Sequence, residues 1–171
     1  MALVAAGLGA AMLVAAMVTA WLWTTGWSPF EKPQPDEVLG AMRDASDQSD
    51  IGDAPTKGGT VLAIPQAATR DFWQRSSIGA APGPDQLSYA SFSIPMSAMP
   101  AMGALTGTIG RHGRFSLRPV ASGAYLLCYA GESRTADYQV QGCGEASLQV
   151  PGRIEASRGE AGFRVTVSGG G

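Results

Sequence analysis

The sequence predicts an all-β protein: a single Greek-key β-sandwich domain preceded by one N-terminal transmembrane helix and a linker. Two observations carry this prediction. The first thirty of the 171 residues contain no charged side chain, and an apolar run fills most of that stretch. Further along, short runs of alternating apolar and polar residues are separated by Gly, Pro, Ser and Asp, which is typical of the strands and turns of a sandwich or barrel.

The first expected element is a membrane-spanning helix over residues 2–24. About 20 mostly apolar residues in a helix cross the hydrocarbon core of a bilayer. Trp21, Trp23 and Trp27 lie where such a helix would leave the bilayer, and tryptophan is enriched at that interface. The sequence therefore predicts a single-pass anchor, which makes other membrane or envelope proteins the expected partners.

The alternative is a signal peptide that is removed, which would leave a secreted soluble domain. Val18 and Ala20 have the spacing of a cleavage site. A signal peptide, however, has a basic segment before an apolar run of roughly 7–15 residues, whereas no Lys or Arg precedes the longer run here. Cleavage would also leave Trp21, Leu22 and Trp23 at the new N-terminus. We favour the uncleaved anchor for these reasons.

Residues 25–57 are expected to form a juxtamembrane linker rich in Pro and Asp. Its first part contains three prolines, and proline-rich segments are extended and semi-rigid. Asp36 then has the features of a helix N-cap, which predicts a short helix over residues 36–45. Ser, Asp and Gly dominate the remainder of the linker, so we expect a tether there.

The sandwich domain is expected over residues 58–168, and its last two strands give the clearest evidence. These two strands flank the sequence RGEAG, a hairpin connection that contains glycine. In another run, Tyr125, Leu127 and Tyr129 alternate with residues of the opposite face. Strands are predicted over residues 60–66, 87–94, 104–110, 114–120, 124–130, 146–152, 153–157 and 163–168.

The stretch IGRHGRFSLRPVASGAYLLCYAG resembles the signature of carboxypeptidase-regulatory-like domains, which are relatives of the transthyretin (prealbumin) fold. The family pattern is a turn that ends in Gly, then Arg-Phe-x-hydrophobic, a short loop, Gly-x-Tyr and an alternating strand. The resemblance implies a β-sandwich of this type in a membrane-anchored bacterial protein, and it implies fold more than function. The matching residues are Gly113, Arg114, Phe115, Leu117, Gly123, Tyr125 and Leu127.

The resemblance covers about 30 residues well and departs from the family pattern elsewhere. Upstream, Gly59, Thr60 and Val61 are similar to the first strand of such a domain. The family has a short loop after that strand, whereas this chain has the long segment RDFWQRSSIGAAPGPDQ. It also has a Met- and Pro-rich insert, PMSAMPAMGA.

The chain has two cysteines, Cys128 and Cys143, and an even number in an exported domain predicts a disulfide. Closing a loop of this length would stabilise the fold by roughly 3 kcal/mol. The alternative is a pair of free buried thiols in a cytosolic domain. Lys32 and Arg43 follow the apolar run and weakly favour a domain on the inside. Because of the cysteines, we place the domain outside the cytoplasm, on the plasma membrane.

No motif in the sequence indicates catalysis, a cofactor or nucleic acid. The formal net charge is −2, and no basic cluster is present. His112 is the single histidine and falls in a predicted turn, where an exposed residue is expected. Met96, Met99 and Met102 have a spacing compatible with copper, but a copper site needs further ligands, so no metal is predicted.

The segment from Arg70 to Arg75 is the candidate contact region. It combines two arginines with Phe72 and Trp73, and Trp and Arg are enriched at the centres of protein interfaces. Together with Tyr89, the two aromatic residues would form a stacking platform for a ligand. The alternative is a loop packed over one end of the sandwich.

The leading interpretation is a non-enzymatic, membrane-anchored module outside the cytoplasm, with a structural or protein-interaction role in the cell envelope. The alternative is a ligand-binding module for a carbohydrate or wall polymer, using the aromatic platform. A hydrolase with an unrecognised site is a third candidate. The exposure of Phe72, Trp73 and Tyr89 in the folded domain distinguishes the first two interpretations.

Overall fold

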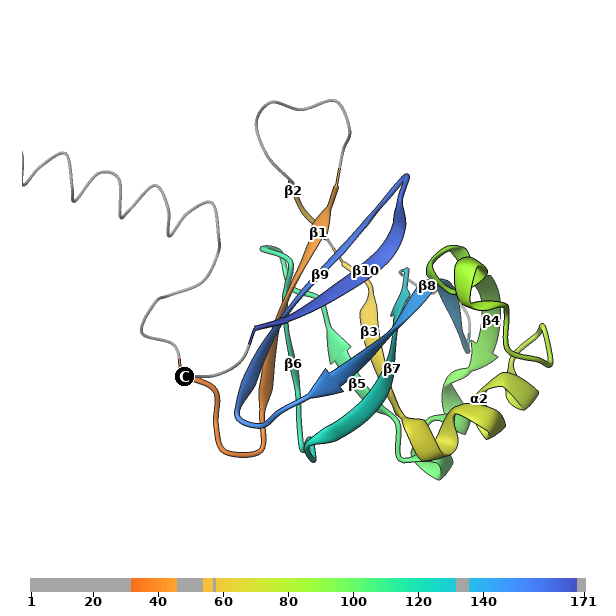
Figure 1. Ribbon diagram of the computed structural model, residues 1–171, viewed down its shortest axis with the longest axis horizontal. Coiled ribbons are helices and arrows are strands. Elements are labelled where there is room, and N and C mark those ends of the chain that lie inside the picture. Colours follow the sequence, from red (N-terminus) through yellow and green to blue (C-terminus); the bar gives the residue numbers. More distant parts are fainter. Residues whose placement is uncertain (1–31, 46–53, 57, 132–135, 169–171) are drawn as a thin grey trace, which may run out of the picture. The chain divides into compact units, whose positions relative to one another are not determined.

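The computed structural model describes residues 32–45, 54–56, 58–131 and 136–168. These residues form two β-sheets and a set of short helices (Figure 1). The expected all-β sandwich is therefore confirmed. The expected anchor, with Trp21, Trp23 and Trp27, lies outside the described residues. Among the residues that are described, no helix has the length and apolar character needed to cross a membrane.

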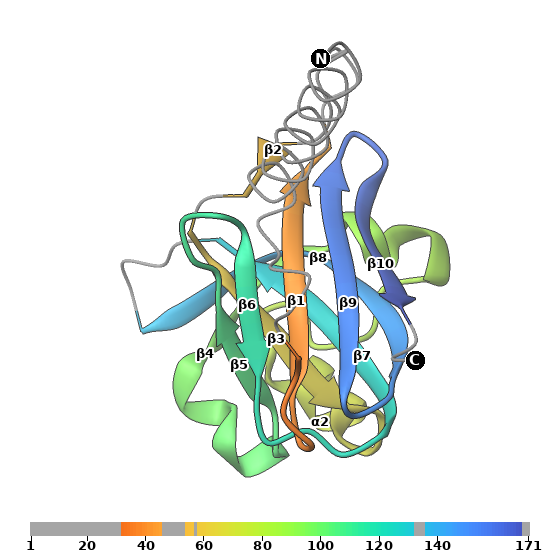
Figure 2. The ribbon, with the colours of Figure 1, turned by 90° about the vertical axis from the view of Figure 1, so that its left-hand side faces the viewer.

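Sheet A has β1 near its centre, with neighbours on both sides (Figure 2). Strand β1 is parallel to β9 and antiparallel to β6. Strand β10 pairs with β9 as the hairpin that the sequence predicts. The strand bounds are β1 (Val38–Asp44), β2 (Ala54–Pro55), β6 (Arg114–Leu117), β9 (Gly152–Gly159) and β10 (Gly162–Ser168).

The predicted short helix over residues 36–45 is wrong, because this segment forms β1. Val38 and Met42 are four residues apart, a spacing that places two side chains on one face of either a helix or a strand. Here both face the interior between the sheets, and β9 and β6 supply the backbone hydrogen bonds. The compact unit begins at Pro33, well before the predicted domain start at residue 58.

Sheet B has the strand order β4-β8-β7-β3-β5. The sequence predicts one strand over residues 87–94. This prediction is wrong for the first half of the run, because residues 87–89 belong to the 3₁₀ helix η2 (Pro84–Tyr89). Strand β8 begins at Asp137, nine residues before the strand predicted over residues 146–152, so most of β8 is missing from the prediction. The strand bounds are β3 (Thr60–Pro65), β4 (Ser91–Pro95), β5 (Leu105–Thr108), β7 (Gly123–Ala130) and β8 (Asp137–Leu148).

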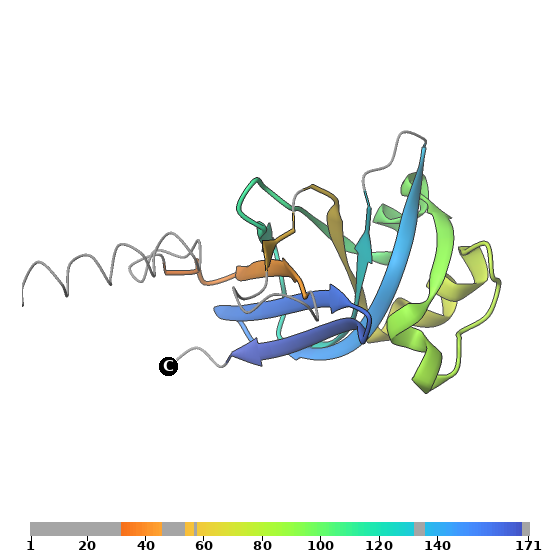
Figure 3. The ribbon, with the colours of Figure 1, turned by 90° about the horizontal axis from the view of Figure 1, so that it is seen from above.

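Sheet B is buried on both faces, as its central strand β7 shows. Tyr125, Leu127 and Tyr129 face sheet A, and the Tyr125 hydroxyl donates to the Ala121 carbonyl at 3.0 Å. The alternate residues of β7 face a second apolar cluster on the other side of the sheet. Short helices cover that outer face: η1 (Gln66–Ala68), α2 (Thr69–Arg75), η2, η3 (Met96–Ala98) and η4 (Pro100–Met102) (Figure 3).

The cysteines form the expected disulfide on this outer face. Cys128 on β7 lies directly opposite Cys143 on β8, with their Cα atoms 4.1 Å apart. A β-bulge precedes Cys143, and Gly142 within it has a φ of 118°. Val140 and Cys143 are three residues apart, so a regular strand would direct them to opposite faces. The extra residue of the bulge directs both to the outer cluster, where Cys143 meets Cys128.

Gly40 of β1 provides a test of the packing between β1 and β6. Its cross-strand neighbour is Phe115, and a Cβ at Gly40 would overlap the Phe115 ring. The ring is 4 % exposed and has no room to move away. We therefore expect Gly40→Ala to lower the free energy of unfolding by about 1–3 kcal/mol, measured by urea denaturation. The control is Gly123→Ala, where nothing lies within 4 Å of the added methyl group; an equal loss there would contradict the packing argument.

The Glu37 carboxylate links the start of β1 to β6. It accepts hydrogen bonds from the Ser116 hydroxyl at 2.6 Å and from the backbone N–H of Gln34 at 2.9 Å. These two bonds lower the pKa of Glu37 below its ordinary value, and the bond from Ser116 has the larger effect. A lowered pKa stabilises the fold above the unfolded-state pKa, and this contribution is lost as the pH falls through the folded-state pKa.

We therefore expect Ser116→Ala to lower the free energy of unfolding at pH 7 by less than about 1 kcal/mol, since the contact is partly exposed to water. At an acidic pH that is low enough to protonate Glu37 in the folded protein, the difference from the unchanged protein should shrink, because the carboxylate is then lost. Urea denaturation at both pH values measures this, with Ser168→Ala in β10 as the control. If Ser116→Ala lowers the free energy of unfolding equally at both pH values, the proposed role of the Glu37 carboxylate is contradicted.

Candidate functional site

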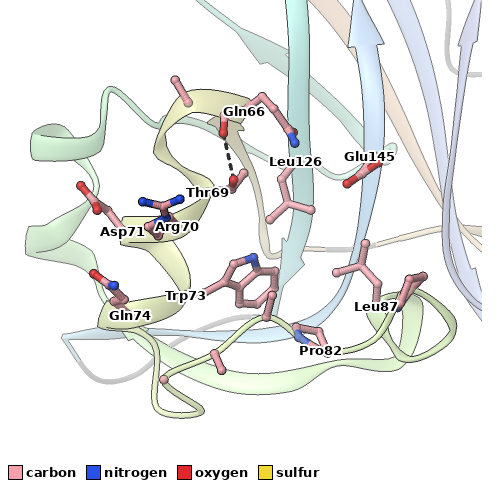
Figure 4. Close-up of a pocket in the computed structure, with 15 residues that line it drawn as sticks. Gln66, Thr69, Arg70, Asp71, Trp73, Gln74, Pro82, Leu87, Leu126 and Glu145 are labelled. Carbon is pink, nitrogen blue, oxygen red and sulfur yellow. Dashed lines mark hydrogen bonds between the residues drawn. The ribbon is translucent and has the colours of Figure 1, made fainter.

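An open cleft with a volume of about 1200 Å³ lies on the outer face of sheet B. Its floor contains Leu126 of β7 and Glu145 of β8, which are direct cross-strand neighbours. One wall is formed by η1 and α2, and the other by the segment from Gly79 to Leu87. Figure 4 shows Trp73 and Leu126 between these walls, with Glu145 on the side opposite α2.

Helix α2 is fixed to sheet B by two buried aromatic residues. Phe72 is fully buried, and Trp73 is 7 % exposed. Together with Phe92 of β4 they form three edge-to-face pairs, with ring centroids 5.0–5.7 Å apart. Such pairs contribute roughly 0.5–1.5 kcal/mol each beyond the burial of their area. The helix has only seven residues and would not be stable by itself, so its position depends on this packing.

Local hydrogen bonds define both ends of α2. At the start, the Thr69 hydroxyl donates to the Gln66 carbonyl at 2.8 Å (Figure 4). At the end, the Ser76 hydroxyl donates to the Trp73 carbonyl at 2.7 Å. Asp71 in the first turn and Arg75 in the last turn complement the helix dipole. These contacts stabilise both ends of the helix that forms one wall of the cleft.

The cleft combines an apolar base with a polar rim. Leu126 and the residual exposed edge of Trp73 form the apolar part, and Leu87 lies half-buried beside them. Amide, hydroxyl, guanidinium and carboxylate groups surround this base and offer both donors and acceptors of hydrogen bonds. The polar side chains that line the cleft are Gln66, Thr69, Arg70, Asp71, Gln74 and Glu145.

The predicted stacking platform of three aromatic side chains does not form. Phe72 is in the core, and only the edge of Trp73 reaches the cleft. Tyr89, in contrast, is 59 % exposed at the end of η2 and lines two smaller hollows. Arg70 lines the cleft, whereas Arg75 is exposed at the end of α2 and is not part of the lining. The alternative, a loop packed over one end of the sandwich, is right that the segment packs against the sandwich, but the segment forms the helix α2 on the outer face of sheet B.

Sequence reasoning missed Glu145, Leu126 and Gln66. Glu145 and Leu126 are 19 positions apart along the chain and become neighbours only through the pairing of β7 with β8. The alternation of β7 does show that Leu126 faces away from Tyr125 and Leu127. No signal in the sequence indicates that helices cover that face and leave it partly open.

The remaining candidates from the sequence lie elsewhere. His112 is exposed in the turn between β5 and β6. Met99 and Met102 are buried in the outer apolar cluster, where they pack under the two short 3₁₀ helices η3 and η4. Within the described part of the chain, no group of three or more His, Cys, Asp and Glu residues is placed to hold a metal ion.

Neither a protein-family model nor a curated protein sequence matches the chain. Among solved structures, it is similar to a candidate carbohydrate-binding protein from Pseudomonas aeruginosa. The two chains share 11 % sequence identity, and the TM-score is 0.44. The similarity covers 75 % of this chain and 91 % of the other. A similarity this distant identifies no ligand for the present chain.

Proposed function

We propose that this protein is a non-enzymatic binding module that holds a hydroxyl-rich ligand, most simply a carbohydrate or wall polymer, in the cleft on the outer face of sheet B. The observation that carries the proposal is the cleft itself: a preformed hollow of about 1200 Å³ with an apolar base and a polar rim. The sequence offers this function as the alternative to a structural role, and the geometry of the cleft supports it best.

The chemistry of the lining favours a sugar over a purely apolar ligand. A sugar ring has apolar C–H faces and a rim of hydroxyl groups that both donate and accept hydrogen bonds. Leu87 and the small exposed parts of Leu126 and Trp73 match the faces, and the amide and carboxylate groups match the hydroxyls. Apolar ligands are normally enclosed in mostly apolar cavities, whereas this cleft is open and lined by six polar side chains.

The proposal places the module outside the cytoplasm and tethered to the plasma membrane. The buried disulfide between Cys128 and Cys143 is consistent with folding in an oxidising compartment. The apolar run of residues 2–24 supplies the anchor in this proposal. The module would keep a glycan close to the membrane without altering it chemically.

The test is binding by the full-length chain in micelles of a detergent that contains no sugar. The probes are dimers and hexamers of β-1,4-linked glucose, α-1,4-linked glucose and β-1,4-linked N-acetylglucosamine. NMR titration should show at least one of them shifting the amide resonances of η1, α2 and Glu145. Glu145→Ala should weaken that binding roughly tenfold, because a hydrogen bond to a charged group is lost.

The matched control is Glu155→Ala, which removes an exposed carboxylate from β9 of sheet A. It should leave the affinity unchanged. The proposal is wrong if none of the six probes binds at millimolar concentration, or if the two glutamate variants weaken binding equally.

A further inference from the structure

We propose that the ligand is a chain of several units rather than a single small molecule, and that it continues from the cleft across Tyr89. This inference rests on the proposed function and deepens it. Its basis is a series of three neighbouring hollows lined by parts of the segment from Ile78 to Ser91.

Shared lining residues show that the hollows adjoin one another. Ala80 and Pro82 line both the cleft and a second hollow of about 510 Å³. Tyr89 and Ser91 line both the second hollow and a third of about 480 Å³. Tyr89 therefore stands between the second and third hollows. A ligand confined to the cleft would leave both of them empty.

Tyr89 is unusually exposed for a large side chain of this fold. It is 59 % exposed, and Ile78 in the same second hollow is 45 % exposed. A ring in this position leaves apolar surface in contact with water, which is unfavourable, and it contributes nothing to the core. Aromatic side chains on a polar surface offer a flat face for stacking together with a polar hydroxyl tip. Both properties suit the alternating C–H faces and hydroxyls of a glycan chain.

Close backbone packing fixes the position of Tyr89. The preceding residue, Ser88, packs against two glycines, one from the β8 bulge and one at the start of β10. A Cβ at Gly142 would lie 2.5 Å from the Ser88 carbonyl oxygen, and one at Gly162 would lie 2.7 Å from the Ser88 hydroxyl. Both glycines have positive φ angles, so they provide the backbone shape as well as the space. The end of η2 is thereby held against both sheets.

The third hollow ends in an ordered polar group, Arg158 of β9. Its Nε donates to Asp44 at 2.6 Å, and its Nη1 donates to the side-chain oxygen of Gln141 at 2.8 Å. The guanidinium also lies over the Tyr129 ring, 4.6 Å from the centroid. Arg158, Asp44 and Gln141 line the hollow next to Tyr89 and present fixed donors and acceptors to a further ligand unit.

The experiment compares the dimers and hexamers of the same three glycans on the full-length chain. We expect a hexamer to bind at least tenfold more tightly than its dimer. Tyr89→Ala should weaken hexamer binding by about five- to tenfold and dimer binding by less than twofold, because the dimer is held in the cleft. Tyr89→Phe keeps the ring and should retain most of the hexamer affinity. Val167→Ala is the control, since Val167 is 36 % exposed on β10 and lines none of the three hollows.

The possible outcomes separate this inference from the proposed function. If dimers and hexamers bind with equal affinity, the series of hollows is not one binding track. If Tyr89→Ala leaves the hexamer advantage unchanged, Tyr89 serves another purpose, such as contact with a protein, and the inference is overturned. If no probe of either length binds, the proposed function itself has failed.

Discussion

The burial of sheet B on both faces is the constraint on which the rest of this structure depends. A sandwich needs to bury only the inner face of each sheet, and the outer face is normally polar. Here Leu62 and Ile64 of β3, and Leu126 and Cys128 of β7, face outward and are buried. The short helices must therefore stay on that face to keep these side chains from water. The cleft is the part of the face that they leave open, so its shape is set by the core.

Two local features make this arrangement possible. The bulge at Gly142 turns Cys143 to the outer face, where the disulfide joins β7 to β8 beneath the helices. The aromatic pairs of Phe72 and Trp73 with Phe92 then fix α2 to β4. Near the last residue of η2, the absence of side chains at Gly142 and Gly162 lets Ser88 approach the two sheets. The bulge thus contributes both to the disulfide and, together with Gly162, to the position of Tyr89.

The sequence predicts the fold better than the site. Alternating side chains in runs such as 114–120 and 124–130 reveal the strands and the inner core, and an even number of cysteines reveals the disulfide. Strand β1 could not be recognised in this way, because a central strand buried on both faces has Val38, Leu39, Ala41 and Met42 all buried and shows no alternation. The cleft depends on Glu145 and Leu126 meeting across two strands and on α2 packing on the same face of the sheet. Neither contact has a local signature in the sequence. Of the three aromatic residues in the predicted platform, Tyr89 alone is exposed.

The central claim is that the helical layer is part of the core, so that the cleft exists before a ligand binds. NMR-detected hydrogen exchange of the full-length chain tests this most directly. The Ser76 amide, which donates to the Phe72 and Trp73 carbonyls at 3.1 and 3.2 Å, should exchange nearly as slowly as the amides of β7. Phe72→Ala should accelerate exchange through η1, α2 and η2 and leave β9 and β10 unchanged. Exchange of the Ser76 amide within seconds in the unchanged protein would contradict the account, because the wall of the cleft would then open independently of the sandwich.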